Sequence, residues 1–581
     1  MANKSFNTAI NQFPLNKEGI IEIKNHCKYG EDWPVVYILS NSREAYVGET
    51  QNAYERMTQH IKTKEKKKLT TIHLMSSNSF NKSAILDIEN MLITHMHADG
   101  RFILQNANGG QSRLHNYYQR SEYQNTFAEI WEKLLDKKLV THSLFEVENN
   151  DIFKFSPYKE LTSEQYHVVE EMLQIYSSAI QQENQTTVVI NGGAGTGKSL
   201  IAIYFLNFIS NILGNNFDIT DVGETIDDES LLNRTNLIKS IKTFGTRKIA
   251  FVIPVPSFRK TVRKVFHTIK ELRGVKVVSP SEAAKGDYDV LVVDEAHRLK
   301  RRVKLTNYGT HDKVNHELQL SCESTELDWL KFTAKKLLIL FYDGGQSVKE
   351  SDVLKEDFDV ITNNPQTKKF YLSSQLRVKG GNEYISFVHD IFNKNPNPYI
   401  LQDGYDLKVF DSCHEMFLAV KEKNVQYKGL CRMLSGLSFY WRRKVRDKKS
   451  TFHQQDFDFE IEGYHYSWND GFNATDFITD DSSIDEIGCI YTCQGHDLNI
   501  AGVIFGKDIS YNPLTKTIEY HPENFIDTNS KSSDQNKTIQ NIINAYLVLL
   551  TRGVYGTYIY AVDENLRNYL KSLIKTDGKI D

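Results

Sequence analysis

Short runs of branched apolar residues recur along the chain, each bounded by polar or glycine-containing stretches. Runs of this length are typical of buried strands, and longer segments of helical periodicity lie between them. This alternation predicts an α/β fold in which parallel sheets take up most of the chain. The runs that predict strands are Val35–Leu39, Ala45–Gly48, Val188–Ile190, Ile249–Val255, Asp289–Val293 and Leu337–Phe341.

The run at Val188–Ile190 leads directly into a glycine-rich loop with the spacing G-x-x-x-x-G-K-S. Glycines allow successive backbone N–H groups to curl around a phosphate, and the apolar segment that follows predicts a helix whose N-terminus faces the anion. Lys198 would reach the β- and γ-phosphates, and Ser199 would bind Mg²⁺. A turn without a ligand is the alternative. The residues predicted to bind the nucleotide are Gly192, Gly193, Ala194, Gly195, Thr196, Gly197, Lys198 and Ser199.

Two further strand ends carry residues suited to ATP hydrolysis. Asp294 and Glu295 follow the run at Asp289–Val293, where Asp294 would bind Mg²⁺ and Glu295 would orient the attacking water. Without Lys198 upstream these residues would indicate an ordinary charged turn. The strand at Leu337–Phe341 leads to Gln346, which can sense the γ-phosphate, although a glycine-rich turn is the simpler interpretation.

Composition limits the possible classes of protein. The 581 residues suffice for about three or four domains, and 40% hydrophobic content supports packed cores. The net charge of −4 means that any surface binding nucleic acid must be a local patch. The six cysteines form no C-x-x-C pair, which favours a reducing cytosol, with Cys489 and Cys493 as core thiols. With no apolar run of membrane-spanning length and no signal-peptide core, we expect a cytoplasmic protein without a membrane partner.

Near the N-terminus, the first two predicted strands form a hairpin on which Tyr37 and Tyr46 can face each other. A helix follows and carries Arg56 and His60 on one face, because they are four residues apart. The lysine-rich segment at 62–68 indicates either a solvated surface or a contact with phosphate.

This layout resembles the GIY-YIG nuclease family between about Pro34 and Gly110. The two family triplets correspond to Val35-Val36-Tyr37 and Tyr46-Val47-Gly48, with valine in place of the first glycine and isoleucine. The other positions that match the family in order and spacing are Thr50, Arg56, His60, Glu89 and Asn106.

The resemblance implies metal-assisted hydrolysis of a phosphodiester. Glu89 would bind one divalent ion, Mg²⁺ or alternatively Mn²⁺. Tyr37 would take the proton of the attacking water, helped by Tyr46, and the site would have to favour a phenolate through neighbouring cations. Arg56 would neutralise charge on the phosphate. Asn106 would hold the pocket together, and His60 is either a proton-transfer group or structural. The alternative is a tyrosine-rich hairpin with Glu89 exposed on an amphipathic helix.

Between this region and the glycine-rich loop, residues 138–159 suit a joint between domains, and the following segment predicts a helix capped by Thr162 and Ser163. Gln165 lies in its first turn. It either contacts an adenine, as the equivalent glutamine of superfamily 1 helicases does, or belongs to the cap. The acidic stretch 218–229 predicts a surface insertion, and the basic stretch 298–304 either contacts nucleic acid or is solvated.

The C-terminal part contains three further motifs. Gln375 and Arg377 follow a short strand, two strands are expected around Gln494–Asp497 within residues 488–506, and a helix leads to Thr551 and Arg552. These segments resemble superfamily 1 helicases, and more closely the Schlafen group 3 DNA/RNA helicase domain, over about residues 161–570. The resemblance implies that Arg377 and Arg552 act as arginine fingers and that Gln494 and Gly495 belong to the nucleotide site.

We therefore expect a small α+β nuclease domain at 1–145, a connector at 146–160, and two RecA-like lobes at 161–370 and 371–581, the second with an insertion near 441–483. The expected function is an ATP-dependent nuclease-helicase that translocates on or remodels nucleic acid, with DNA favoured over RNA. Defence against phage or foreign DNA suits this architecture, and an oligomer or a partner protein is compatible with it. Two alternatives stay open: a nuclease gated by an ATP sensor that does not translocate, and an ATP-dependent scaffold with an inactive nuclease fold.

Overall fold

The computed structural model describes residues 6–26, 28–105, 117–214, 228–305, 307–393, 396–402, 404–439, 458–468, 477–478, 480–493, 495–528 and 530–575. By internal packing these residues divide into two compact units, one built from residues 1–174 and 203–243 and the other from 175–202 and 244–581. Residues 218–227 of the predicted insertion and most of the segment 441–483 lie outside the described residues.

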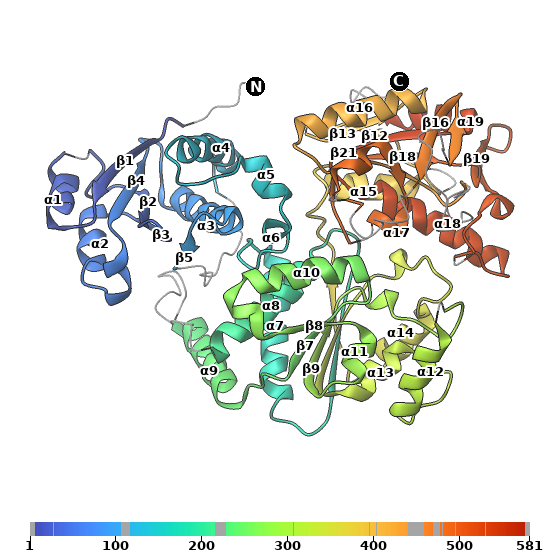
Figure 1. Ribbon diagram of the computed structural model, residues 1–581, viewed down its shortest axis with the longest axis horizontal. Helices are drawn as coiled ribbons and strands as arrows, with labels where there is room; N and C mark the ends of the chain where they lie inside the picture. Colours follow the sequence, from blue (N-terminus) through green and yellow to red (C-terminus); the bar gives the residue numbers. More distant parts are fainter. Residues whose placement is uncertain are drawn as a thin grey trace, which may run out of the picture. The chain divides into compact units, whose positions relative to one another are not determined.

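A mixed five-stranded sheet with the order β1-β4-β2-β3-β5 forms the centre of the first unit (Figure 1). The predicted hairpin is present as the antiparallel pair β2 and β3. Apolar side chains alternate along the strands, so each face of the sheet has its own core, one with α1 and α2 and the other with α3 and α4. The elements are β1 Ala9–Pro14, α1 Lys17–His26, β2 Val35–Ser40, β3 Glu44–Thr50, α2 Ala53–His60, η1 Lys64–Lys68, β4 Thr71–Ser76, α3 Lys82–Asp99, β5 Ile103–Leu104, α4 Arg120–Asp136, α5 Leu144–Asn149 and α6 Asp151–Lys154.

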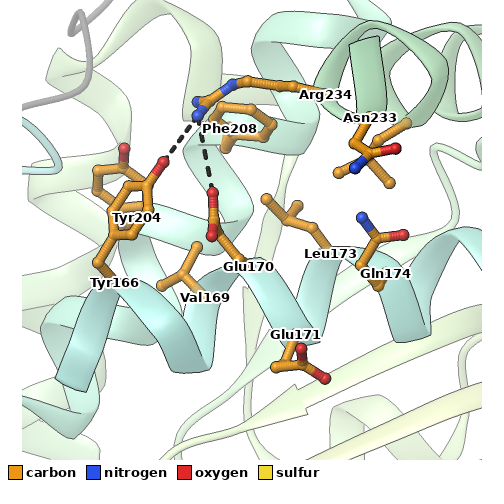
Figure 2. Close-up of a pocket in the computed structure, with 11 residues that line it drawn as sticks. Tyr166, Val169, Glu170, Glu171, Leu173, Gln174, Tyr204, Phe208, Asn233 and Arg234 are labelled. Atoms are coloured by element: carbon orange, nitrogen blue, oxygen red, sulfur yellow. Dashed lines mark hydrogen bonds and ion pairs between the residues drawn. The ribbon is translucent and has the colours of Figure 1, made fainter. Parts of the chain in front are cut away.

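Three longer helices follow, α7 Ser163–Ala179, α8 Lys198–Leu213 and α9 Asp228–Phe244. Within the first unit, side chains of these helices enclose a cavity of about 240 Å³ (Figure 2). Arg234 of α9 donates a hydrogen bond to the Tyr166 hydroxyl across 2.7 Å and lies over the ring of Phe208. These contacts join α7, α8 and α9 through the half-buried Arg234.

The second unit contains a parallel six-stranded sheet with the order β11-β6-β10-β9-β7-β8. Strands β6, β7, β9 and β10 are largely buried on both faces, which accounts for their continuous apolar runs, whereas the edge strand β11 is mostly exposed. Strand β11 pairs with β6, so residues 371 and 372 lie in this first parallel sheet. The strands are β6 Thr186–Gly192, β7 Ile249–Val252, β8 Lys276–Val278, β9 Tyr288–Val293, β10 Ala334–Tyr342 and β11 Lys368–Leu372, and the helices are α10 Pro256–Thr268, α11 Pro280–Ala284, α12 Tyr308–Glu317, α13 Glu326–Thr333 and α14 Lys355–Thr362.

This unit also contains a seven-stranded sheet with the order β13-β21-β18-β14-β17-β16-β15. Its described strand pairs are parallel except β15 with β16. The expected fold, a small mixed domain followed by two parallel-sheet lobes, is thereby confirmed. The strands are β13 Asp406–Val409, β14 Cys431–Ser435, β15 Phe459–Ile461, β16 Tyr464–Trp468, β17 Glu486–Gly488, β18 Leu498–Phe505 and β21 Gly553–Ala561, with helices α15 Gly381–Asp390, α16 Cys413–Gln426, α17 Ile490–Cys493, α18 Gln535–Leu550 and α19 Glu564–Ser572.

One local expectation was wrong. The segment Cys489–Cys493 was expected to be a strand, but Ile490–Cys493 forms the short helix α17. The Thr492 hydroxyl accepts a hydrogen bond from the Cys489 N–H across 3.0 Å and donates one to the Cys489 carbonyl across 2.9 Å. These side-chain bonds satisfy backbone groups that a strand would have paired with a neighbour. Cys489 and Cys493 are buried thiols, as expected.

Candidate functional site

The two tyrosines of the hairpin lie on the same face of the first sheet. The ring centroids of Tyr37 and Tyr46 are 6.2 Å apart, with an angle of 29° between the ring planes. Tyr37 on β2 is opposite Gly48 on β3, and its ring crosses the glycine so closely that an added Cβ would lie 2.3 Å from the phenolic oxygen. Gly48 is therefore required for this position of Tyr37.

Helix α2 brings Arg56 and His60 to the Tyr37 hydroxyl. The Tyr37 oxygen is 2.7 Å from Nε2 of His60, and Nε of Arg56 donates to the same oxygen across 3.4 Å. The phenolic oxygen accepts from Arg56 and has a single hydrogen to donate, which we assign to the bond with His60. This assignment makes His60 a neutral imidazole with its hydrogen on Nδ1.

The sequence predicted that neighbouring cations would favour the phenolate form of Tyr37. This prediction was wrong. Burial, with a smaller contribution from Tyr46, raises the pKa of Tyr37 well above its ordinary value, and the charge of Arg56 does not reverse this. Burial, together with Arg56 and Lys66, lowers the pKa of His60 to about 3. Tyr37 therefore keeps its proton, and His60 is a neutral acceptor beside it.

Glu89 lies midway along α3, where its side chain is half-buried rather than exposed. Its carboxylate accepts a hydrogen bond from the backbone N–H of Glu49. Burial and the charge of Glu49 raise the pKa of Glu89 to about 8. The Glu49 side chain itself binds Lys82, with oxygen–nitrogen distances of 2.7 and 2.9 Å.

These residues fit a divalent cation. Carboxylate oxygens are the ligands that Mg²⁺ and Mn²⁺ prefer, and a cation would relieve the repulsion between the neighbouring Glu49 and Glu89. Within the described part of the chain there is no group of three or more His, Cys, Asp and Glu side chains that could hold a metal ion. Water would therefore complete the coordination of an ion at Glu89. Asn106, which the family pattern places in this pocket, lies outside the described residues.

The lysine-rich segment forms the turn η1, and its side chains are not equivalent. The ammonium nitrogen of Lys66 lies 3.2 Å from the ring centroid of Tyr46 and 3.2 Å from Oε1 of Gln105. Lys64, Lys67 and Lys68 are exposed. The turn is thus largely solvated, and one lysine enters the tyrosine cluster. Its contact with phosphate stays a prediction.

In the second unit, strand β6 ends at the glycine-rich loop and α8 begins at Lys198, as the spacing predicts. Gly195 and Gly197 have φ values of 80° and 83°, a region that glycine adopts without strain. Lys198 is buried, and its ammonium donates to the carbonyl of Gly193 across 2.8 Å and to the Asp343 carboxylate across 3.2 Å. The loop is therefore preformed, with its lysine held by a carboxylate.

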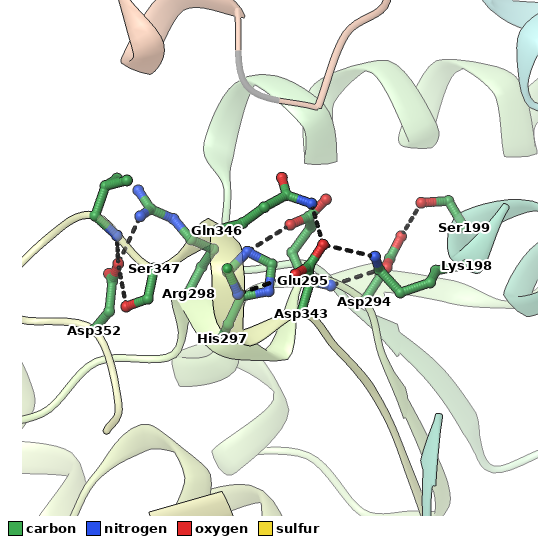
Figure 3. A network of polar contacts seen from close by, with 12 residues as sticks. Lys198, Ser199, Asp294, Glu295, His297, Arg298, Asp343, Gln346, Ser347 and Asp352 are labelled. Carbon is green, nitrogen blue, oxygen red and sulfur yellow. Dashed lines mark hydrogen bonds and ion pairs between the residues drawn. The ribbon is translucent and has the colours of Figure 1, made fainter. Parts of the chain in front are cut away.

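Ser199, Asp294 and Glu295 converge beside this lysine (Figure 3). The Ser199 hydroxyl donates to the Asp294 carboxylate across 2.5 Å, so the two oxygens expected to bind Mg²⁺ already lie together. Burial and the neighbouring Glu295 raise the pKa of Asp294 to about 6. Burial opposes ionisation of Glu295, but His297, 2.9 Å away, and Lys198 outweigh it and hold the pKa of Glu295 below its usual range.

Gln346 connects the two lobes of this unit. Its amide nitrogen donates to Asp343 across 2.6 Å, and its amide oxygen accepts from Arg552 across 3.1 Å. Arg552 follows α18 of the second lobe and is buried. An unbroken series of polar contacts therefore runs from Lys198 through Asp343 and Gln346 to Arg552.

Arg377 also lies in this region, but its partner is a carboxylate of the second lobe. Its Nε is 2.5 Å from Oδ1 of Asp497. Burial, followed by the charge of Arg377, lowers the pKa of Arg552, which places the two predicted arginine fingers near each other. Gly495 adopts a φ of 83°, whereas Gln494 lies outside the described residues.

The segment before Arg377 contacts the phosphate-binding loop directly. Gln375 donates to the Ala194 carbonyl across 2.7 Å, and the Leu376 N–H donates to the Gly195 carbonyl across 3.0 Å. These bonds occupy carbonyl groups and leave the N–H groups of the loop for a phosphate. The sequence motif identified Gln375 without indicating this contact.

Gln165 is buried in the first turn of α7 and takes part in its cap. Its amide oxygen accepts from the Thr162 N–H across 3.0 Å, and its own N–H donates to the Thr162 hydroxyl across 3.2 Å. The prediction that Gln165 belongs to the helix cap is therefore confirmed. A contact of Gln165 with adenine stays a prediction.

The basic segment at 298–304 is largely neutralised within the second unit. Arg298 pairs with Asp352 at 2.6 Å, Arg302 with Asp312 at 2.7 Å, and Lys304 with Glu350 at 2.7 Å. A cation held in a buried or bidentate pair is not available to a phosphate backbone. These pairs make the segment chiefly structural.

Sequence reasoning assigned no role to Glu49, His297 or Asp343, although each contacts a predicted site residue. His297 and Asp343 directly adjoin recognised motifs, so the sequence could have identified them from their positions at strand ends. The sequence does not single out Glu49, because Glu89 is distant in the chain and only the packing of α3 brings the two residues together.

Among the helices of the described residues, none combines the length and the apolar character that crossing a membrane requires. This observation concerns only those helices.

Comparison with known proteins agrees with both motif sets. The Schlafen group 3, DNA/RNA helicase domain matches residues 185–563, and the GIY-YIG catalytic domain matches residues 34–98. An uncharacterized protein of Saccharomyces cerevisiae is 27% identical over 446 residues, which cover 71% of this chain and 90% of the yeast protein.

Among solved structures, the Pif1 helicase from Candida albicans is similar at 12% identity and a TM-score of 0.24, covering 71% of this chain and all of that one. The Bacteroides Pif1 helicase in complex with ADP-AlF3 and ssDNA is similar at 9% identity and a TM-score of 0.24, covering 69% of this chain and 96% of that one. TM-scores this low add nothing to the assignment.

The two matching domains both belong to catalytic families and act on nucleic acid, so the chain is an enzyme that combines a nuclease with a helicase-type ATPase. The helicase match spans more than half of the sequence. The chain therefore belongs to the family of the Schlafen group 3 DNA/RNA helicase domain and carries a GIY-YIG catalytic domain ahead of it.

Proposed function

We propose that this enzyme uses ATP hydrolysis to translocate on or remodel nucleic acid, DNA in preference to RNA, and cleaves its phosphodiester bonds by metal-assisted hydrolysis. The observation that carries the proposal is the series of contacts from Lys198 through Asp343 and Gln346 to Arg552. A γ-phosphate at Lys198 would compete with Asp343 for the ammonium. Loss of that contact would alter the bond between Gln346 and Arg552, and so link nucleotide state to the second lobe.

In hydrolysis of ATP, each residue of this series has a role that follows from its contacts. Lys198 would exchange Asp343 for phosphate oxygens, and Ser199 and Asp294 would hold Mg²⁺. Glu295, kept ionised by His297, orients the attacking water. Arg552 and Arg377 stabilise the charge that develops on the transferred phosphoryl group, once Arg377 leaves Asp497.

In the nuclease site, Tyr37 and His60 act as a proton relay. Burial, Arg56 and Lys66 hold the pKa of His60 low, and the negative charge of a bound phosphodiester would raise it. The attacking water then gives its proton to the Tyr37 oxygen as the phenolic hydrogen passes to Nε2 of His60, so no phenolate has to form beforehand. Arg56 donates to the same phenol and neutralises charge on the phosphate. A divalent ion held by Glu89 would supply Lewis-acid polarisation of the scissile phosphate.

We further propose that the biological role is defence against phage or foreign DNA, because a motor that delivers DNA to a nuclease in the same chain suits destruction of long molecules. Survival of cells challenged with phage, with and without a chain carrying Glu89→Ala, tests this. Equal survival would exclude the role.

The biochemical proposal is tested by cleavage of a plasmid in Mg²⁺ or Mn²⁺, with ATP, a non-hydrolysable analogue or no nucleotide. Wild type is compared with Glu89→Ala and Lys198→Ala. We expect both variants to lose cleavage, with ATP required and the analogue inactive. If the analogue supports cleavage, the helicase domain acts as a nucleotide switch. If wild type cuts no better than Glu89→Ala, the nuclease fold is a docking module.

A further inference from the structure

Lys66 occupies a defined position in the nuclease site. Its ammonium lies against the face of the Tyr46 ring, 3.2 Å from the centroid, and donates to Oε1 of Gln105. Gln105 is held in turn by its amide nitrogen, which donates to Glu44 across 2.8 Å. The ammonium is thus fixed from two sides on a side chain that would otherwise be mobile.

The neighbouring lysines provide the contrast. Lys64, Lys67 and Lys68 belong to the same short turn and are exposed, whereas Lys66 is partly buried. The turn therefore directs one of its four lysine charges to the ring that stacks against Tyr37.

The charge of Lys66 reaches the catalytic pair. The Tyr46 ring centroid is 5.3 Å from that of His60, and Lys66 acts with burial and Arg56 to lower the pKa of His60. Two cations therefore contact the tyrosine pair: Arg56 hydrogen-bonds both phenols, and Lys66 lies on the face of the Tyr46 ring. A phosphodiester bound at this pair would meet both positive charges.

We propose that Lys66 is a second catalytic cation of phosphodiester cleavage and contacts the scissile phosphate beside the Tyr46 ring, together with Arg56. This inference rests on the proposed nuclease function. Attack by water forms a bond to phosphorus and breaks the bond to the leaving oxygen, which takes a proton from solvent, while the proton of the attacking water enters the relay at Tyr37. Lys66 forms no covalent bond and donates hydrogen bonds to non-bridging oxygens as their charge increases.

A lysine suits this role because its ammonium has three donors on a flexible stem. Its contacts with the Tyr46 ring and with Gln105 are non-covalent, so the ammonium can exchange them for phosphate oxygens. The simpler alternative is that Lys66 only supports the Tyr46 ring by packing against it. An uncharged side chain of similar length would support the ring equally well. Charge and volume can therefore be separated by substitution.

The test compares Lys66→Met, Lys66→Arg and the matched control Lys67→Met, whose side chain is exposed in the same turn. The single-turnover cleavage rate is measured at saturating enzyme in Mg²⁺. Affinity for the same oligonucleotide is measured separately in EDTA, where no cleavage is needed, and thermal unfolding checks that each variant is folded. Removal of one group that stabilises developing charge typically lowers the rate about 10²- to 10³-fold.

We expect a loss of that size for Lys66→Met with an affinity within about threefold of wild type, retention of most activity in Lys66→Arg, and a wild-type rate for Lys67→Met. A rate for Lys66→Met within about threefold of wild type would overturn the assignment, as would a loss confined to affinity. Wild type that does not cleave at all would instead overturn the proposed nuclease function, so the two failures are distinguishable.

Discussion

Tyr37 and His60 share a hydrogen bond of 2.7 Å in which both side chains are buried. The phenol has a raised pKa and the imidazole a lowered one, so the proton rests on Tyr37 until water attacks. His60 at the end of α2 is therefore the group that can receive the phenolic hydrogen of Tyr37.

We predict that His60→Gln lowers the cleavage rate about 10²- to 10⁴-fold, the range for loss of general acid–base catalysis. The double variant with Tyr37→Phe should be no worse than Tyr37→Phe alone, because the two residues act as one unit. Single-turnover cleavage measures both. His73→Gln is the control, since His73 is also buried in this sheet but bonds Ser40. If the loss of cleavage rate in the double variant equals the product of the losses in the two single variants, the relay is contradicted.

Gly48 provides a second prediction about the same phenol. Gly48→Ala would place a methyl group 2.3 Å from the Tyr37 oxygen, so the ring must move and its bond to His60 must break. We expect cleavage to fall at least about 10²-fold, as for misplacement of a catalytic group, while ATP hydrolysis stays at the wild-type rate. Gly274→Ala, where an added Cβ meets no atom within 4 Å, should change neither activity. Normal cleavage by Gly48→Ala would show that the position of Tyr37 is not critical.

Much of the fold and of each site could be predicted because the signals were local. The glycine-rich loop, Asp294 and Gln346 all follow short apolar runs, and the carboxyl ends of parallel strands meet at one edge of a sheet. Residue spacing on α2 likewise placed Arg56 and His60 on one face.

The remaining features depend on packing between distant segments. The pairs Lys198–Asp343 and Arg377–Asp497 join residues more than a hundred positions apart, and no periodicity encodes them. The protonation of Tyr37 was misjudged because sequence shows nearby cations but not the burial that outweighs them. The segment Cys489–Cys493 was misassigned because a short apolar run does not distinguish a strand from a buried helical turn.

The link between Gln346 and Arg552 leads to a prediction about coupling. Gln346→Ala removes the bond between the lobes but leaves Lys198 and Ser199 in place, so nucleotide binding should persist. We expect the kcat of ATP hydrolysis with single-stranded DNA to fall at least about tenfold, with an unchanged Kd for ATP. Arg552→Lys should behave similarly, because lysine cannot reproduce the planar guanidinium. Full stimulation by DNA in Gln346→Ala would exclude this route of coupling.

Asp343 holds Lys198 before nucleotide binds, at a distance of 3.2 Å. Asp343→Asn should raise the affinity for ADP, because binding no longer has to break an ion pair, and should lower kcat, because Gln346 loses a charged acceptor. Fluorescence titration and steady-state hydrolysis measure the two effects. Weaker ADP binding in a folded Asp343→Asn variant would mean that Asp343 positions Lys198 for the nucleotide instead of competing with it.

A last prediction concerns pH and stability in the second lobe. Burial raises the pKa of Asp508 to about 6, although the Tyr546 hydroxyl donates to it across 2.6 Å. A carboxyl with a higher pKa in the folded state holds its proton longer there, so the folded state is favoured at low pH and loses stability as pH rises through about 6. At about pH 8 the charged Asp508 should cost about 3 kcal/mol of unfolding free energy.

Asp508→Asn removes that penalty and keeps an acceptor for Tyr546. Its unfolding midpoint should exceed that of wild type at about pH 8, and the difference should shrink towards about pH 5. Asp406→Asn is the control of opposite sign, because the Tyr558 hydroxyl and Lys408 hold the pKa of Asp406 below its usual range despite burial. That variant should be less stable than wild type at about pH 8. A difference between Asp508→Asn and wild type that does not change with pH would mean that Asp508 titrates normally in the folded protein.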